Sequence, residues 1–109
     1  MFKLAKEPQF THDVPVQVPV DGGHEAQTLK ARFRVIADDA AEEFDVSTTD
    51  GLKDFLRAAV VRIDDIVDEA NDPVVWSADL FEELLNLAYV RIGLWNGYIK
   101  GLVGARLGN

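Results

Sequence analysis

The sequence contains no cysteine and only two histidines, His12 and His24. Without thiolates the chain forms neither disulfides nor iron–sulfur sites, and it lacks the usual structural zinc ligands. Both histidines stand beside expected turns or strand ends, and no G-x-S-x-G nucleophile motif accompanies them. We therefore expect no enzyme activity, no catalytic residues and no cofactor. A metal site built on His12, Asp13, Asp21 and His24 is the less favoured alternative to solvated turn histidines.

Basic residues are also scarce, since 11 Lys and Arg stand against 19 Asp and Glu, which gives a formal charge of −8. Affinity for nucleic acid depends on cationic contacts to phosphates, so we expect no nucleic-acid partner. The charge is uneven: residues 37–83 carry 15 acidic and three basic groups, while residues 84–109 carry three basic groups and no acidic ones. This pattern indicates an acidic surface and an apolar surface with different roles.

Long uninterrupted apolar runs are missing as well. Residues 84–107 form the most apolar segment, but four polar or charged residues interrupt it, namely Asn86, Arg91, Asn96 and Lys100. Such side chains cost free energy inside a bilayer, so this segment is not expected to span a membrane. The opening residues 1–8 are too polar for the apolar core of a signal peptide. We therefore expect no membrane association and a protein of the cytoplasm.

An early β-hairpin is the firmest pattern that the sequence does contain. Residues 13–20 alternate valine with other residues, which is the period of a half-buried strand, and Pro15 and Pro19 place that strand at the edge of its sheet. Residues 21–24 supply a turn, and residues 27–36 alternate again with a basic outer face. That face is expected to pair with the acidic middle of the chain or with a partner.

The middle of the chain predicts one helix and leaves two segments open. Residues 37–45 fit either a loop or a short helix. Ser47 or Thr48 is an N-cap, from which a helix runs to about residue 60. Residues 60–68 fit a helix extension or a strand, and we favour a short second hairpin that turns and returns through residues 71–76.

Two helices are expected in the C-terminal third. Ser77 is the N-cap of a helix to about Leu87, and the last helix spans residues 89–103. Three glycines, Gly93, Gly97 and Gly101, line one stripe of the last helix. A glycine inside a helix lowers the stability of that helix by about 1 kcal/mol relative to alanine. We therefore expect close packing against the stripe to offset this loss, either by the hairpin or the preceding helix of the same chain, or by a second copy or a partner helix. Residues 1–109 are thus expected to form a single α+β domain with an N-terminal β-hairpin, a short second hairpin and about three helices.

Seven short segments, in a fixed order and spacing, carry a family likeness. They are KEPQFTH at residues 6–12, VPVDGG at 18–23, LKARFRV at 29–35, FLRA at 55–58, DDIVDE at 64–69, YVR at 89–91 and GAR at 104–106. Together they resemble the small tail assembly chaperones of long-tailed bacteriophages and prophages. The chain departs from that family at residues 70–73, where an Asp-Gly-Asn-Pro type of turn is usual, and in the final helix, where alanine and leucine usually replace the glycine stripe.

The resemblance implies a non-enzymatic protein of the bacterial host cytoplasm. Such chaperones coat the apolar, helical tape measure protein until tail tube subunits displace them, and a homo-oligomer is compatible with that role. We expect the client to meet apolar side chains of the last two helices, namely Leu84, Leu87, Tyr89, Ile92, Trp95, Tyr98 and Ile99. The acidic middle segment would keep the coated complex soluble. The alternative is a structural virion component, a tail terminator or head–tail joining protein.

Overall fold

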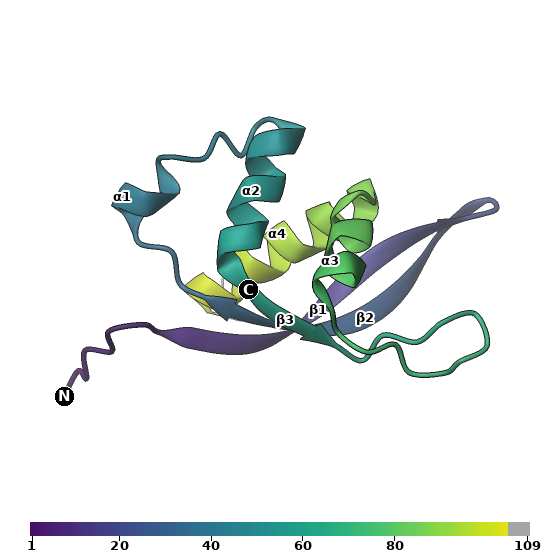
Figure 1. Cartoon of the computed structure of the whole chain (residues 1–109), viewed down its shortest axis with the longest axis horizontal. Coiled ribbons are helices and arrows are strands. Elements are labelled where there is room, and N and C mark those ends of the chain that lie inside the picture. The colour runs from purple at the N-terminus through teal and green to yellow at the C-terminus, as the bar shows by residue number, and fades with distance from the viewer. Residues whose placement is uncertain (105–109) are drawn as a thin grey trace.

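A long β-hairpin opens the chain and two helices close it in the computed structural model, which describes residues 1–104 (Figure 1). The elements are β1 (Gln9–Val20), β2 (Gly23–Arg34), α1 (Asp38–Ala41), α2 (Thr49–Ala59), β3 (Val60–Asp64), α3 (Ala78–Leu85) and α4 (Ala88–Val103). The expected α+β class, with its N-terminal hairpin and its two C-terminal helices, is confirmed. Residues 105 and 106, which belong to the last segment of the family likeness, lie outside the described residues.

The sheet is antiparallel, with the strand order β1-β2-β3. The hairpin register is continuous from the pair Gln9 and Arg34 to the pair Val20 and Gly23. Gly22, in the two-residue turn, has a φ of 82°, a conformation that glycine adopts without steric cost. β1 is an edge strand, as its two prolines require.

The expected second hairpin is reduced to a single bridge between Val67 and Pro73. Residues Val60–Asp64 do form a strand, but this strand pairs with β2 and not with residues 74–76. The physical reason is burial, because pairing with β2 places Ile63 in the core that the long hairpin already provides. A separate two-stranded hairpin is only marginally stable in water.

The helices begin where the sequence predicts. The side chain of Thr48 accepts a hydrogen bond from the Gly51 N–H (3.0 Å) at the start of α2. Ser77 accepts one from the Leu80 N–H (3.0 Å) at the start of α3. These bonds satisfy backbone donors that the first helical turn leaves without a partner. Of the two alternatives for residues 37–45, the short helix forms, as α1.

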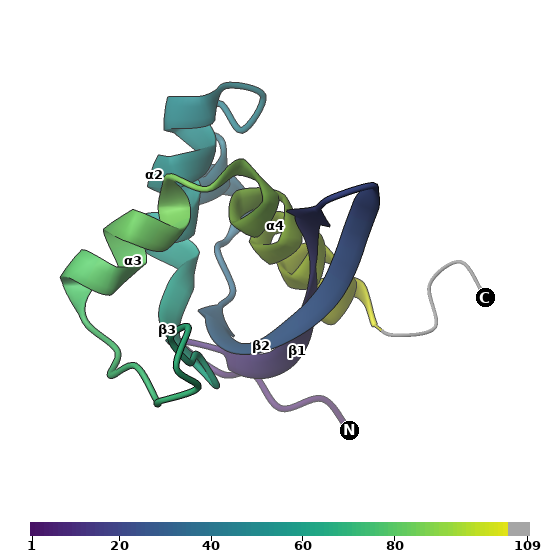
Figure 2. The ribbon, with the colours of Figure 1, turned by 90° about the vertical axis from the view of Figure 1, so that its right-hand side faces the viewer.

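The hydrophobic core lies between one face of the sheet and the helices α2, α3 and α4. The hairpin curls around α4, and α2 and α3 pack on the other sides of that helix (Figure 2). Alternate residues of β1 and β2 point inward to meet them. The buried side chains are Val14, Val16, Leu29, Ala31, Phe33, Phe55, Leu56, Ala59, Val60, Ile63, Phe81, Leu85, Val90, Leu94 and Tyr98.

The glycine stripe of α4 packs against β1 of the same chain. A Cβ atom added at Gly97 would lie 2.6 Å from Val14 Cγ2, and one added at Gly93 would lie 3.0 Å from Val16 Cγ2. Gly101 faces the ring of Phe10 in the same way. Of the two explanations for the stripe, internal packing is therefore the one observed, and the stripe is not a free docking surface.

The outer face of the sheet is basic, as predicted. Lys30, Arg32 and Arg34 are exposed, and the Arg32 guanidinium donates to Gln9 Oε1 (2.8 Å) and to Thr11 Oγ1 (3.0 Å). Of the two alternatives for this face, pairing with the acidic middle of the chain is seen only as the strand register that places Lys30 opposite Asp64, since none of the three cations forms an ion pair within residues 1–104. Across the same range, no helix combines the length and the apolar character needed to cross a membrane.

Candidate functional site

An open groove lies between the distal half of the hairpin and the corner where α3 meets α4. Its volume is about 390 Å³, which is within the range of ordinary ligand pockets. The lining comes from three parts of the chain that are distant in sequence: the hairpin, the segment after β3 and the α3–α4 corner. It consists of Val16, Val18, Gln27, Thr28, Leu29, Asp65, Ile66, Val67, Leu84, Leu87, Tyr89 and Val90.

The floor of the groove belongs to the core, and its walls are partly exposed. Val16, Leu29 and Val90 are buried and form the floor. Leu87, on the helical wall, keeps 39% of its surface exposed although it is a large apolar residue. Val67, on the opposite wall, is also exposed. Apolar surface in contact with water around a depression favours the binding of another apolar surface.

Leu87 occupies a position that a capping residue would normally fill. It is the N-cap of α4, with φ −97° and ψ 113°, and its side chain makes no capping hydrogen bond. Leucine is among the poorest N-cap residues, and it lowers the stability of the helix by about 1 kcal/mol relative to Ser, Thr or Asp at this position. A local rule broken in this way is typical of functional positions. The corner is held instead by Arg91, whose guanidinium donates to the Leu85 carbonyl at 2.7 Å.

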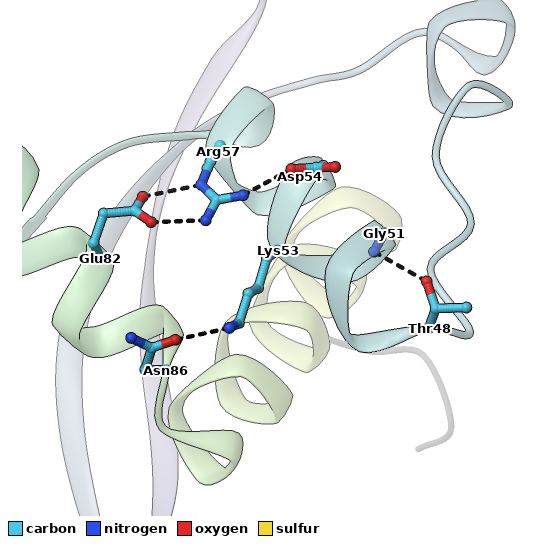
Figure 3. Close-up of polar contacts among 7 residues, drawn as sticks. All are labelled: Thr48, Gly51, Lys53, Asp54, Arg57, Glu82 and Asn86. Atoms are coloured by element: carbon cyan, nitrogen blue, oxygen red, sulfur yellow. Dashed lines mark hydrogen bonds and ion pairs between the residues drawn. The ribbon is translucent and has the colours of Figure 1, made fainter.

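Polar contacts link α2 to α3 (Figure 3). The Arg57 guanidinium donates to both carboxylate oxygens of Glu82, at 2.9 and 2.7 Å, and to Asp54 at 2.7 Å. The hydrogen bonds from Arg57 lower the pKa of the Glu82 carboxyl below its usual value. Lys53 donates to the Asn86 side chain at 2.7 Å, next to the α3–α4 corner. These exposed contacts link α3 to α2 on the side of α3 that leads to the α3–α4 corner, and each contributes little on its own.

The segment after β3 adds one acidic residue, Asp65, to the rim. Asp65 lines the groove and has a φ of 63°. The carboxylate of Asp68 accepts hydrogen bonds from the backbone N–H groups of Ala70 (2.9 Å) and Asp72 (3.0 Å), so it shapes the turn. The rim next to Asp65 therefore favours cationic over anionic groups on whatever occupies the groove.

Three of the residues expected to meet a client line this groove, and a fourth lies beside it. Leu84, Leu87 and Tyr89 are lining residues. Ile92 is 58% exposed and lies three positions after Tyr89 on α4, which places it on the same side of that helix. These four residues therefore lie at or beside the groove, and their contact with a client stays a prediction.

The other three expected residues belong to the packed interior. Tyr98 is only 3% exposed, and its hydroxyl accepts a hydrogen bond from the Ile36 N–H at 3.1 Å. Trp95 is half-buried, with its ring centroid 5.3 Å from that of Phe55, and Ile99 is half-buried against the same core. The expectation that Tyr98 contacts the client is therefore wrong, because its side chain is buried. Trp95 and Ile99 pack against the core and do not line the groove.

Sequence reasoning missed the hairpin side of the groove. The sequence pattern predicts Val18 only as a strand residue, and Ile66 and Val67 only as part of the second hairpin, yet all three line the groove. Their positions depend on contacts between distant segments, which no local pattern records. One feature of the sequence did indicate this wall. The valines of β1 continue to Val20, past Val14 and Val16, which the glycine stripe of α4 covers.

The alternative metal site does not form. His12 lies opposite Ala31 near the start of the hairpin, whereas His24 lies opposite Pro19 beside the turn. The two imidazoles are thus separated by several strand residues, each of which adds about 3.3 Å. Among residues 1–104, no three His, Asp or Glu side chains are placed to hold a metal ion.

The chemistry that the groove offers is apolar contact beside a carboxylate. This matches the recognition mode in which an amphipathic helix lays its apolar side chains into a hydrophobic groove.

Comparisons of the chain with models of known protein families, with curated proteins and with solved structures found no match.

Proposed function

We propose that this chain is a tail assembly chaperone of a long-tailed phage or prophage. In this proposal it binds apolar helical segments of the tape measure protein in the host cytoplasm, until tail tube subunits displace it. The observation that carries the proposal is the partly exposed apolar groove beside Leu87, together with the family likeness of the sequence. The role requires binding alone and involves no chemical step on the client.

The size of the groove suits weak, repeated binding. Burying one large aliphatic side chain contributes about 1.5–3 kcal/mol, and a groove of about 390 Å³ accepts only a few such side chains. The loss of translational and rotational freedom on association offsets much of this gain. Several copies can bind along one client, each through its own weak contact, so each copy stays exchangeable, and tube subunits require that exchange.

The charge of the chain supports the same role. Residues 37–83 carry 15 acidic groups against three basic ones, and the carboxylates of α1 lie on the surface. A client coated with copies of strong negative charge repels other coated clients. The bound copies thereby have two effects: they cover the apolar surface of the client, and their negative charge opposes aggregation.

Co-expression with the tape measure protein tests the proposal. The wild-type chain should raise the soluble fraction of the client, and Leu87→Asp should abolish this effect because it removes the apolar side chain of Leu87 from the groove wall, while the new carboxylate can cap α4 and preserve the helix. Val75→Asp is the control, since Val75 is also an apolar residue on the surface, 83% exposed, but lies outside the groove. A client that stays equally insoluble with and without the wild-type chain would refute the proposal, as would full activity of the Leu87→Asp chain.

Mass spectrometry of purified virions separates this function from that of a tail terminator or head–tail joining protein. A chaperone should be missing from finished tails, because tube subunits have replaced it. A structural component should be present in a fixed stoichiometry. Recovery of this chain at such a stoichiometry would replace the chaperone assignment by the structural one.

A further inference from the structure

An N-terminal arm, defined here as residues 1–7, leaves the body of the protein ahead of β1 (Figure 1). Its base is fixed at Pro8, whose carbonyl accepts a hydrogen bond from the Val35 N–H at 2.9 Å. The arm exposes three large apolar side chains: Met1 is fully exposed, Phe2 is 87% exposed and Leu4 is 85% exposed. Exposed apolar side chains gain free energy from any surface that covers them.

The chemistry of the arm is complementary to that of the groove. In an extended chain Phe2 and Leu4 point to the same side, about 7 Å apart, while Lys3 points to the other side. The groove provides an apolar floor with walls at Val67 and Leu87, and Asp65 adds a carboxylate to the rim. Two apolar side chains match the groove, and the lysines of the arm match its acidic rim.

The arm cannot reach the groove of its own chain with both apolar residues. Leu4 lies four residues before the fixed Pro8, so its Cα atom stays within about 14 Å of Pro8 even when the arm is fully extended. Val16, the nearest lining residue on β1, lies eight strand residues beyond Pro8, about 26 Å along the strand. Figure 1 also shows the arm pointing away from the turn end of the hairpin.

We propose that the N-terminal arm of one copy docks into the groove of a second copy. Phe2 and Leu4 then enter the groove beside Leu87, and the lysines of the arm face the carboxylate of Asp65. The inference rests on the same groove as the proposed function, so the arm and the client compete for it. The unoccupied chaperone protects its apolar groove by self-association, and client binding releases the arm.

Sedimentation velocity at increasing protein concentration tests this docking. The wild-type chain should associate, whereas Phe2→Asp/Leu4→Asp and Leu87→Asp should each lower the association constant by about tenfold or more. Val67→Asp is a second groove variant for the case in which Leu87→Asp disturbs the helix corner. Val75→Asp is the control and should associate like the wild type, and thermal melts should verify that every variant is folded.

Mixing the variants gives the decisive result. The Phe2→Asp/Leu4→Asp chain retains a groove, and the Leu87→Asp chain retains an arm, so the mixture should form heterodimers although each variant alone does not. A wild-type chain that is monomeric throughout, or an arm variant that associates like the wild type, would overturn the inference.

The proposed function is tested separately by client solubility, because the arm variant should still solubilise the tape measure protein. Loss of rescue on substitution of the groove, with self-association intact, would overturn the arm docking alone. Loss of self-association with client rescue intact in the groove variants would overturn the client site alone.

Discussion

Replacing Gly97 by alanine tests how closely α4 packs on β1. In an exposed helix the substitution would stabilise the fold by about 1 kcal/mol, because glycine is the poorer helix former. Here the new methyl group would lie 2.6 Å from Val14 Cγ2 and 3.2 Å from Val14 Cγ1. Val14 is completely buried, and its branched side chain has little rotamer freedom. Overpacking of this kind costs about 1–3 kcal/mol, so we expect a net destabilisation of about 1 kcal/mol.

Urea denaturation followed by circular dichroism measures this change in the free energy of unfolding. Asn96→Ala, one residue away on the exposed side of α4, is the control and should be neutral or slightly stabilising. A further variant, Val14→Ala, removes the two methyl groups that cause the clash. In that background Gly97→Ala should stabilise the protein, because only the gain in helix propensity and the filled space remain.

The reversal of sign between the two backgrounds is the critical result. If Gly97→Ala stabilises the otherwise unchanged protein by about 1 kcal/mol, as in an exposed helix, the close approach of α4 to β1 is refuted. Equal effects in both backgrounds would show that Val14 is not the neighbour responsible.

Three further substitutions test other parts of the fold. Thr48→Ala removes the N-cap of α2 and should lower the free energy of unfolding by about 1 kcal/mol in urea titrations. Tyr98→Phe leaves the Ile36 N–H without its partner and should cost about 1–3 kcal/mol in the same assay. The pKa of Glu82 is lowered by hydrogen bonds from Arg57, so its stabilising contribution is present above the ordinary pKa of 4.5 and is lost as the pH falls below it. Acid titrations should therefore show a smaller loss of stability below that pH for Glu82→Gln than for the wild type.

Local signals in the sequence were sufficient for most of the fold. The alternation and prolines of β1, the turn at Gly22, and the N-caps Thr48 and Ser77 each predicted the element that forms. The partner of β3 was not predictable in the same way, since residues 60–64 find their neighbour in β2 across a long stretch of chain. Pairing between distant strands depends on which core is already available, and a local pattern carries no such information.

The candidate site was only half predictable for a related reason. α4 carries apolar residues on all sides, which is typical of a helix packed between other elements, so its sequence did not distinguish Tyr98, in the core, from Ile92, on the surface. Leu84, Leu87 and Tyr89 were expected at the client surface and do line the groove. The hairpin wall at Val18 required the three-dimensional arrangement of the chain.

Nuclear magnetic resonance of the isotope-labelled chain, titrated with an apolar helical fragment of the tape measure protein, tests the central claim most directly. The account predicts that backbone amide signals shift around Ile66, Leu87 and Tyr89, at the walls of the groove, while those of Lys30 and Arg32 on the outer face of the sheet stay in place. Shifts confined to the outer face, or no shifts at saturating fragment, would contradict the assignment of the groove as the client site.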